Sequence, residues 1–253
     1  MMNKFLEYVP GDSLLHRMNP TAKLLAAMVF AIMCFCTSNL VILVAALVIG
    51  LVLARSCGMM RQTAGLMKAV AVFSIILAIL LVFTTPAGAV LVPLPWGYIG
   101  TGSLIAAVTM IIRLEAAAIP LFLVFYVTKM TDMANAAVKN LHVPYKYAFT
   151  FMSTVHFIPV FMNDMKAIME AQTSHGVRFD EGGLANKVRL MVPLCVPLLV
   201  SSVRKTNSAA IAAEVRGFNL RTRACGYKEY PFAGADIAAL VASVALLVVA
   251  IAL

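Results

Sequence analysis

Long apolar runs separated by short polar segments dominate the first half of the chain. The first run covers residues 24–54 and is interrupted by three turn-forming polar residues, Thr37, Ser38 and Asn39. This run is too long for one membrane helix of about 20 residues, so the pattern predicts a tight helical hairpin with two short arms. One tilted helix is the alternative. It would place the basic residues after the run across the membrane from the basic N-terminus, against the positive-inside tendency.

Three further apolar runs follow, at residues 69–83, 103–127 and 232–253. The segment 84–102 carries no charge and is rich in proline and glycine, so we expect a translocated loop with Trp96 at the outer membrane interface. Two shorter apolar stretches, 147–162 and 190–203, contain prolines and fit interfacial, buried or partly inserted helices equally well. The pattern therefore predicts an all-α polytopic membrane protein with about five to seven membrane helices.

Composition supports this class. Of the 253 residues, 62% are hydrophobic and 12% are charged, and the mean hydropathy is +0.93. Soluble domains are about half apolar and about one quarter charged, so a soluble domain is excluded. The high apolar content also excludes an intrinsically disordered chain.

The distribution of charged residues predicts how the chain is oriented in the membrane. The chain has 20 Lys and Arg against 11 Asp and Glu, and ten of these basic residues lie in residues 163–230. Basic excess is typical of cytoplasmic segments. We therefore expect N-terminal membrane helices in residues 1–128, a cytoplasmic or interfacial helical module in 129–231 and a terminal membrane helix in 232–253, with the N-terminus cytoplasmic. Nucleic-acid binding is disfavoured because aromatic residues do not alternate with the basic ones.

The sequence contains no recognisable catalytic or metal-binding motif. It has no G-x-x-x-x-G-K-[ST] loop for nucleotide phosphates, its four histidines are scattered, and its five cysteines lack zinc-ligand spacing. We therefore expect no catalytic residue, no metal and no cofactor. Arg113 and Glu115 lie inside an apolar run, where charges are costly and often functional. Pairing with a neighbouring helix is the simpler explanation for both.

A weak internal repeat lies in the charged module. Residues 164–175 form one amphipathic stretch that ends at Gly176, and residues 204–216 form another that ends at Gly217. In the second stretch, small side chains lead to one cation at helical spacing, namely Ala209, Ala212, Ala213 and Arg216. A basic residue followed by glycine favours helix termination in any helix, so one such end alone indicates little. Two ends 41 residues apart suggest two equivalent docking sites, because an alanine face permits close approach and guanidinium binds carboxylates in a bidentate manner.

With these ends in view, the chain resembles the transmembrane T component of energy-coupling factor (ECF) transporters, which belong to the ATP-binding-cassette (ABC) class. The resemblance covers nearly the whole chain and includes YVPGDSLLHRMNPTAKL at residues 8–24, LHVP at 141–144 and HFIP at 156–159. It implies two coupling helices, at about 163–176 and 203–217, each ending in an Ala-Arg-Gly-like triplet that docks on an ABC-type ATPase.

Carried over by position, the triplets are Ser174-His175-Gly176 and Val215-Arg216-Gly217. The first departs from the family because His175 stands where arginine is usual, and a largely neutral imidazole attracts an acidic groove less than guanidinium does. Either the first ATPase differs to match, or Arg178 supplies the charge.

The resemblance further implies a non-catalytic coupling subunit in a prokaryotic plasma membrane. Its expected partners are two ATPases, a membrane substrate-binding (S) subunit and the lipid bilayer, and the expected cargo is a vitamin or a transition-metal ion. The alternative is a stand-alone secondary transporter or channel for a small solute, for which Arg113, Glu115 and Pro120 are the sequence evidence.

Overall fold

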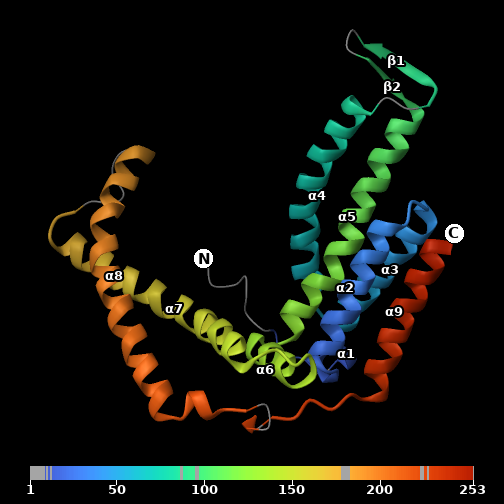
Figure 1. Ribbon diagram of the computed structural model, residues 1–253. Coiled ribbons are helices and arrows are strands. Elements are labelled where there is room, and N and C mark those ends of the chain that lie inside the picture. Colours follow the sequence, from blue (N-terminus) through green and yellow to red (C-terminus); the bar gives the residue numbers. More distant parts are fainter. Residues whose placement is uncertain are drawn as a thin grey trace. The chain divides into compact units, whose positions relative to one another are not determined.

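The computed structural model describes residues 9, 11, 13–85, 88–94, 97–177, 183–222, 225–226 and 228–252. The chain divides into two compact units. The first unit comprises Met1–Ala136 and Tyr230–Leu253, and the second unit comprises Ala137–Glu229. The elements of the first unit are α1 (Leu14–Arg17), α2 (Pro20–Cys36), α3 (Leu40–Ser56), α4 (Met60–Thr84), β1 (Val90–Leu94), β2 (Gly97–Gly100), α5 (Thr101–Val127), the first turns of α6 (Met130–Asn140), and α9 (Gly234–Ala252) (Figure 1). The second unit contains the end of α6, then α7 (Tyr145–Ser174), α8 (Leu184–Val215) and a short 3-10 turn, η1 (Phe218–Leu220).

The predicted turn at residues 37–39 is present and joins α2 and α3, each of 17 residues, into an open hairpin whose two helices pack against α5 more than against each other. An asparagine caps the start of each helix. The side-chain oxygens of Asn19 and Asn39 each accept the backbone N–H two residues ahead, both at 3.0 Å. Each cap satisfies one of the N–H groups that a helix start leaves without an intrahelical partner.

Arg113 of α5 has a structural partner at the turn of this hairpin. Its guanidinium donates to the backbone carbonyl oxygen of Thr37 at 2.8 Å, just after the end of α2. The cation thereby satisfies a carbonyl that a helix end leaves free and complements the negative end of the helix dipole. Glu115 is buried on the same helix, with 6% of its surface exposed.

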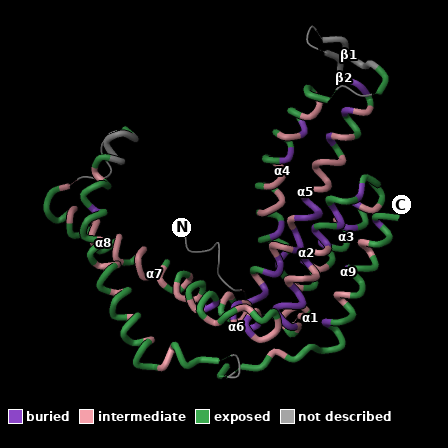
Figure 2. The backbone as a smooth tube through the Cα atoms, viewed as in Figure 1, coloured by how far each residue is buried: buried purple, intermediate pink, exposed green. Residues whose placement is uncertain are grey.

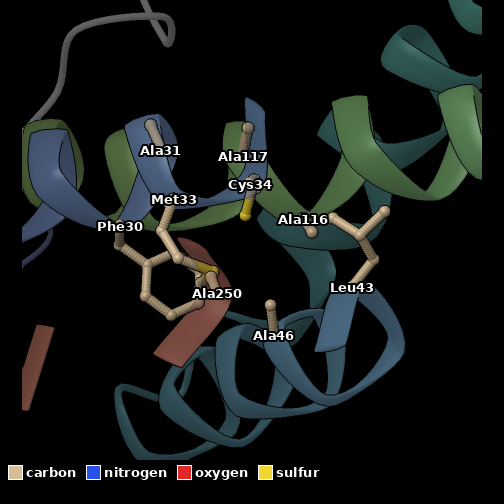
Figure 3. Packing of buried hydrophobic residues seen from close by; sticks show 9 residues of the cluster. All are labelled: Phe30, Ala31, Met33, Cys34, Leu43, Ala46, Ala116, Ala117 and Ala250. Carbon is tan, nitrogen blue, oxygen red and sulfur yellow. The ribbon is translucent and has the colours of Figure 1, made fainter. Parts of the chain in front are cut away.

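Small side chains allow the membrane helices to approach closely. A buried cluster joins α2, α3, α5 and α9, and five of its nine members are alanines (Figure 3). Its members are Phe30, Ala31, Met33, Cys34, Leu43, Ala46, Ala116, Ala117 and Ala250. Close approach suits a bilayer, where helix association depends on packing more than on the hydrophobic effect. α2 and α5 carry much of the buried surface of this unit (Figure 2).

Five helices of the described residues have the composition of membrane helices. α4, α5 and α9 are long enough to cross a bilayer, and α2 and α3 are shorter apolar helices. Large apolar side chains of α4, among them Phe73 and Phe83, are about 60% exposed, at 59% and 60%. Such exposure is expected of a helix that faces lipid or another apolar partner. The predicted all-α polytopic fold is confirmed, with three helices among the described residues that are long enough to span a membrane and two shorter apolar helices beside them.

The segment between α4 and α5 differs from the predicted loop. β1 and β2 form an antiparallel hairpin in which Leu94 pairs with Gly97 and Pro93 pairs with Tyr98. Proline is tolerated in an edge strand at a position whose N–H would point away from the partner strand. Trp96 lies outside the described residues.

In the second unit, α7 and α8 are longer than the coupling helices expected at 163–176 and 203–217. α7 has 30 residues and α8 has 32. Each helix continues without a break from the short apolar stretch before it, through Pro159 in α7 and through Pro193 and Pro197 in α8. The expected coupling helices are therefore the C-terminal halves of two long helices.

Gly50 of α3 lies close to Ile119 of α5 and gives the first prediction. A Cβ at this position would lie 3.2 Å from Cγ2 of Ile119. We expect Gly50→Ile to separate the two helices and to lower stability by about 1–3 kcal/mol, the usual cost of overpacking. The check is a lower midpoint of thermal unfolding in detergent. The matched control is Gly65→Ile in α4, where nothing lies within 4 Å of the added Cβ; equal midpoints for the two variants would contradict the prediction.

Candidate functional site

The first candidate docking end is the C-terminus of α7. Gly176 has φ of 90°, a conformation that glycine adopts without strain. Its N–H donates to the Thr173 carbonyl at 2.9 Å, and the Val177 N–H donates to the Gln172 carbonyl at 3.1 Å. These two bonds form a complete Schellman motif, which satisfies the last carbonyls of the helix. Glycine therefore ends α7 as the sequence predicted.

The second candidate docking end is the C-terminus of α8. Gly217 has φ of 71°, and its N–H donates to the Glu214 carbonyl at 2.9 Å. The chain then forms η1, whose Leu220 N–H donates back to the Gly217 carbonyl at 2.9 Å. This end is consequently held by a short 3-10 turn immediately beyond it.

Aromatic packing anchors the second end to the start of α7. The Phe218 ring lies 4.8 Å from the Phe149 ring and 5.7 Å from the Tyr145 ring, measured between centroids. The Arg221 guanidinium lies over the Tyr145 ring, 5.2 Å from its centroid, and donates to the Tyr145 hydroxyl. Such ring and cation contacts each stabilise by roughly 0.5–1.5 kcal/mol. Because Phe218 is two residues beyond Arg216, they fix the chain next to the second triplet.

α7 and α8 contact each other (Figure 1), and an ion pair joins them at a point that we call the crossing. The Lys205 ammonium lies 2.6 Å from Asp164 Oδ2, and the Ser201 hydroxyl donates to the same oxygen at 2.9 Å. Asp164 and Lys205 are 41 residues apart, which is also the spacing of the two triplets. The pair therefore joins equivalent positions of the internal repeat.

The spacing makes the two ends equivalent in length. Each terminal glycine follows its member of the ion pair by 12 residues. At 1.5 Å per residue, about 18 Å of helix extends from the crossing to either end. The second unit thus presents two ends at matched distances from one fixed crossing point.

The ion pair gives a prediction about pH. The hydrogen bond from Lys205 holds the pKa of Asp164 below its ordinary value of 3.8. A lowered pKa in the folded state contributes stability above the ordinary pKa and loses it as the pH falls through the lowered value. We expect Lys205→Met to remove the acid sensitivity of the α7–α8 contact. At neutral pH the variant should weaken this contact only slightly, because exposed ion pairs contribute little stability. Hydrogen exchange of α7 and α8 peptides at pH 7 and pH 3 checks this; the same acid response in wild type and variant would count against it.

Most of the predicted docking residues are accessible. Ser174, His175, Gly176, Val215 and Arg216 are exposed, and Val215 reaches 83%. Gly217 is half-buried. Of the predicted alanine face, Ala212 is exposed while Ala209 and Ala213 are half-buried. Arg178 lies outside the described residues.

The two triplets differ in charge. Within the part of the chain that the structure describes, neither Arg216 nor His175 has a side-chain hydrogen bond or ion pair. The guanidinium of Arg216 therefore remains available to a carboxylate or carbonyl of another molecule. No group of three or more metal-ligating side chains occurs among the described residues.

Sequence reasoning missed the contacts that hold the two ends in place. The Asp164–Lys205 pair was detectable in principle, since both residues occupy the same position of the repeat. The ring cluster of Tyr145, Phe149 and Phe218 gave no such pattern, because it joins the start of one helix to residues beyond the end of another.

Comparison with known proteins gives one family. The family model described as "CbiQ: Cobalt transport protein" matches residues 11–224. Among curated proteins, the energy-coupling factor transporter transmembrane protein EcfT of Listeria innocua is 32% identical over 231 residues, covering 86% of each chain. EcfT of Bacillus selenitireducens is 28% identical over 221 residues, covering 84% of this chain and 82% of its own. EcfT of Bacillus subtilis is 26% identical over 251 residues, covering 95% and 94%.

Proposed function

The chain belongs to the CbiQ family and is the transmembrane T component of an energy-coupling factor transporter, and from this we propose that α7 and α8 couple two ABC-type ATPases to a separate membrane S subunit. The observation that carries the proposal is the pair of glycine-terminated ends at equal distances from the Asp164–Lys205 crossing. Two equivalent ends suit two similar partners, since symmetric assemblies offer the same kind of groove twice.

The chemistry of the two ends supports docking on acidic or carbonyl-lined grooves. Val215-Arg216-Gly217 offers an exposed guanidinium beside the partly accessible alanine face of Ala209, Ala212 and Ala213. Guanidinium binds carboxylates through two parallel hydrogen bonds, which fixes orientation as well as position. Ser174-His175-Gly176 offers an exposed imidazole instead, so we propose that its ATPase groove is less acidic or that Arg178 supplies the cation.

The proposed mechanism is mechanical. When the two ATPases bind ATP and close, they bring the two docked ends closer together, and the change at the α7–α8 crossing alters the apolar surface offered to the S subunit. Helices that end in rigid, capped turns transmit such a displacement without local unfolding. ATP hydrolysis belongs to the partner subunits, and this chain contributes no catalytic residue.

Orientation and cargo follow from the same proposal. The second unit and the N-terminus face the cytoplasm of a prokaryotic cell, in accordance with the positive-inside tendency and with the location of ATP. The cargo is a vitamin or a transition-metal ion bound by the S subunit.

Purification from native membranes tests the proposal. The tagged chain is extracted in mild detergent, co-eluting proteins are identified by mass spectrometry, and ATPase activity is measured. We expect two ABC-type ATPases and one small hydrophobic protein, with ATPase activity in the eluate. A chain that elutes alone, without ATPase activity, and that transports solute by itself in vesicles would overturn the proposal and favour a secondary transporter or channel.

A further inference from the structure

The chain passes between its two units at two places in the sequence. It leaves the first unit after Ala136 and returns to it at Tyr230. α6 runs continuously across the first of these points, and Asp132 lies in its first turn. These two connections are the covalent paths along which a displacement of the second unit can reach the membrane helices.

A hydrogen bond joins the two connections inside the first unit. The Tyr230 hydroxyl donates to Asp132 Oδ1 at 3.0 Å, although the two residues are 98 positions apart. Burial and this hydrogen bond raise the pKa of Tyr230 above its ordinary value. A hydrogen bond to a carboxylate is stronger than one between neutral groups.

The returning connection is also tied to the start of α2. The Asn19 side-chain amide donates to the Tyr230 carbonyl at 2.7 Å, and the Asn19 backbone N–H donates to Asp236 Oδ1 at 2.9 Å. Asp236 Oδ2 accepts the Ala233 N–H at 2.8 Å. Asn19 is 5% exposed and Asp236 is 0% exposed, so water competes little for these bonds.

The α5–α6 junction is attached to the same turn of α2. The Lys23 ammonium donates to the Thr128 hydroxyl at 3.3 Å, and both side chains are 4% exposed. Thr128 is the residue after α5 and lies two residues before α6. The first turn of α2 thus contacts the chain just before it leaves the first unit and just after it returns.

We propose that Asn19, Asp132, Tyr230 and Asp236 form a clasp that makes the two connections move together and transmits displacement of the second unit to α2 and α9. The clasp rests on the proposed function, because it acts on the motion that the ATPases produce. These residues are positioning residues: they contact neither ATP nor cargo. Without the Tyr230–Asp132 bond, the α6 connection and the 230–236 segment are coupled less tightly, and the ion pair of Lys139 with Glu229, at 4.0 Å, is a weaker link that remains.

Hydrogen exchange in the assembled complex tests the clasp. The complex purified from native membranes is placed in nanodiscs, and exchange is compared between the nucleotide-free state and the state trapped with ATP and vanadate. In the wild type we expect the nucleotide to change exchange both in α7 peptides and in peptides covering residues 13–36 and 228–245. In Tyr230→Phe we expect the α7 response to persist and the response of the other two regions to fall to less than half. Losing a hydrogen bond to a charged group changes the equilibrium between the bonded and the separated state of the two connections by about tenfold.

Two further variants sharpen the test. Asp132→Asn keeps an acceptor oxygen and should retain most of the response. Tyr147→Phe removes a hydroxyl from an exposed tyrosine of α7 and should behave as the wild type.

The remaining outcomes each decide the matter. A first-unit response in Tyr230→Phe equal to that of the wild type overturns the clasp, and so does its absence in the wild type. If Tyr230→Phe exchanges faster than the wild type without nucleotide but keeps the full response to nucleotide, the Tyr230–Asp132 bond contributes only to stability, and the clasp is overturned. A wild-type complex without ATPases refutes the proposed function instead, which the mass spectrum of the same preparation shows directly.

Discussion

Purified from its native membranes, the Arg216→Glu variant is expected to retain far less ATPase than the wild type. Arg216 is exposed at the end of α8 and has no side-chain partner among the described residues. The glutamate would be repelled by the acidic groove that Arg216 is proposed to enter, and a carboxylate of the ATPase would lose its cationic partner. Loss of a buried interfacial charge pair costs about 2 kcal/mol or more, which is roughly thirtyfold in affinity.

The control for this variant is Arg204→Glu, the same charge change on an exposed residue of the same helix, one position before Lys205. It should leave ATPase binding near the wild-type level. His175→Glu should weaken binding less than Arg216→Glu, because it removes no permanent cation. The ratio of ATPase to tagged chain, by quantitative mass spectrometry, measures all three. Full retention of both ATPases by Arg216→Glu would exclude the second triplet as a docking site.

Replacement of Asp236 by alanine is expected to be the most destabilising single change in the first unit. Its carboxylate accepts two backbone N–H groups, from Asn19 and Ala233, and is completely buried. Removing it leaves two buried backbone donors without their acceptor, and we expect a loss of about 3 kcal/mol or more.

The expected observation is a lower yield of folded protein and a lower midpoint of thermal unfolding in detergent. Ser243→Ala in the same helix is the matched control. Its hydroxyl donates only to the Leu240 carbonyl of its own helix, at 2.8 Å, so its loss should have a small effect. If Asp236→Ala unfolds at the same temperature as Ser243→Ala, the buried hydrogen bonds contribute nothing measurable to stability.

Local sequence patterns predicted those features whose causes are local. Thr37, Ser38 and Asn39 interrupt an apolar run, and the hairpin turns there. Gly176 and Gly217 follow amphipathic stretches, and each adopts a positive φ at a helix end. The positions of helix starts were less predictable, because α7 and α8 continue through prolines that would end many helices.

Long-range polar contacts were not predictable from the same patterns. Asn19 and Asp236 are 217 residues apart, and neither lies in a charged cluster or a binding motif. Their pairing depends on α2 and α9 packing side by side, which follows from small residues distributed over four helices. The β1–β2 hairpin was missed because its prolines favoured a loop.

The positions of the prolines in α7 and α8 determine where these helices bend most easily. Pro159 lies five residues before Asp164, and Pro197 lies eight residues before Lys205, while no proline occurs between either ion-pair residue and its terminal glycine. Each proline removes one hydrogen bond of the helix, so flexion concentrates at these points. Beyond the crossing, each helix behaves as a stiff lever arm of about 18 Å. A force applied at either glycine therefore reaches the crossing with little bending of the helix in between. The second unit bends more easily at the prolines, which precede the crossing in each helix.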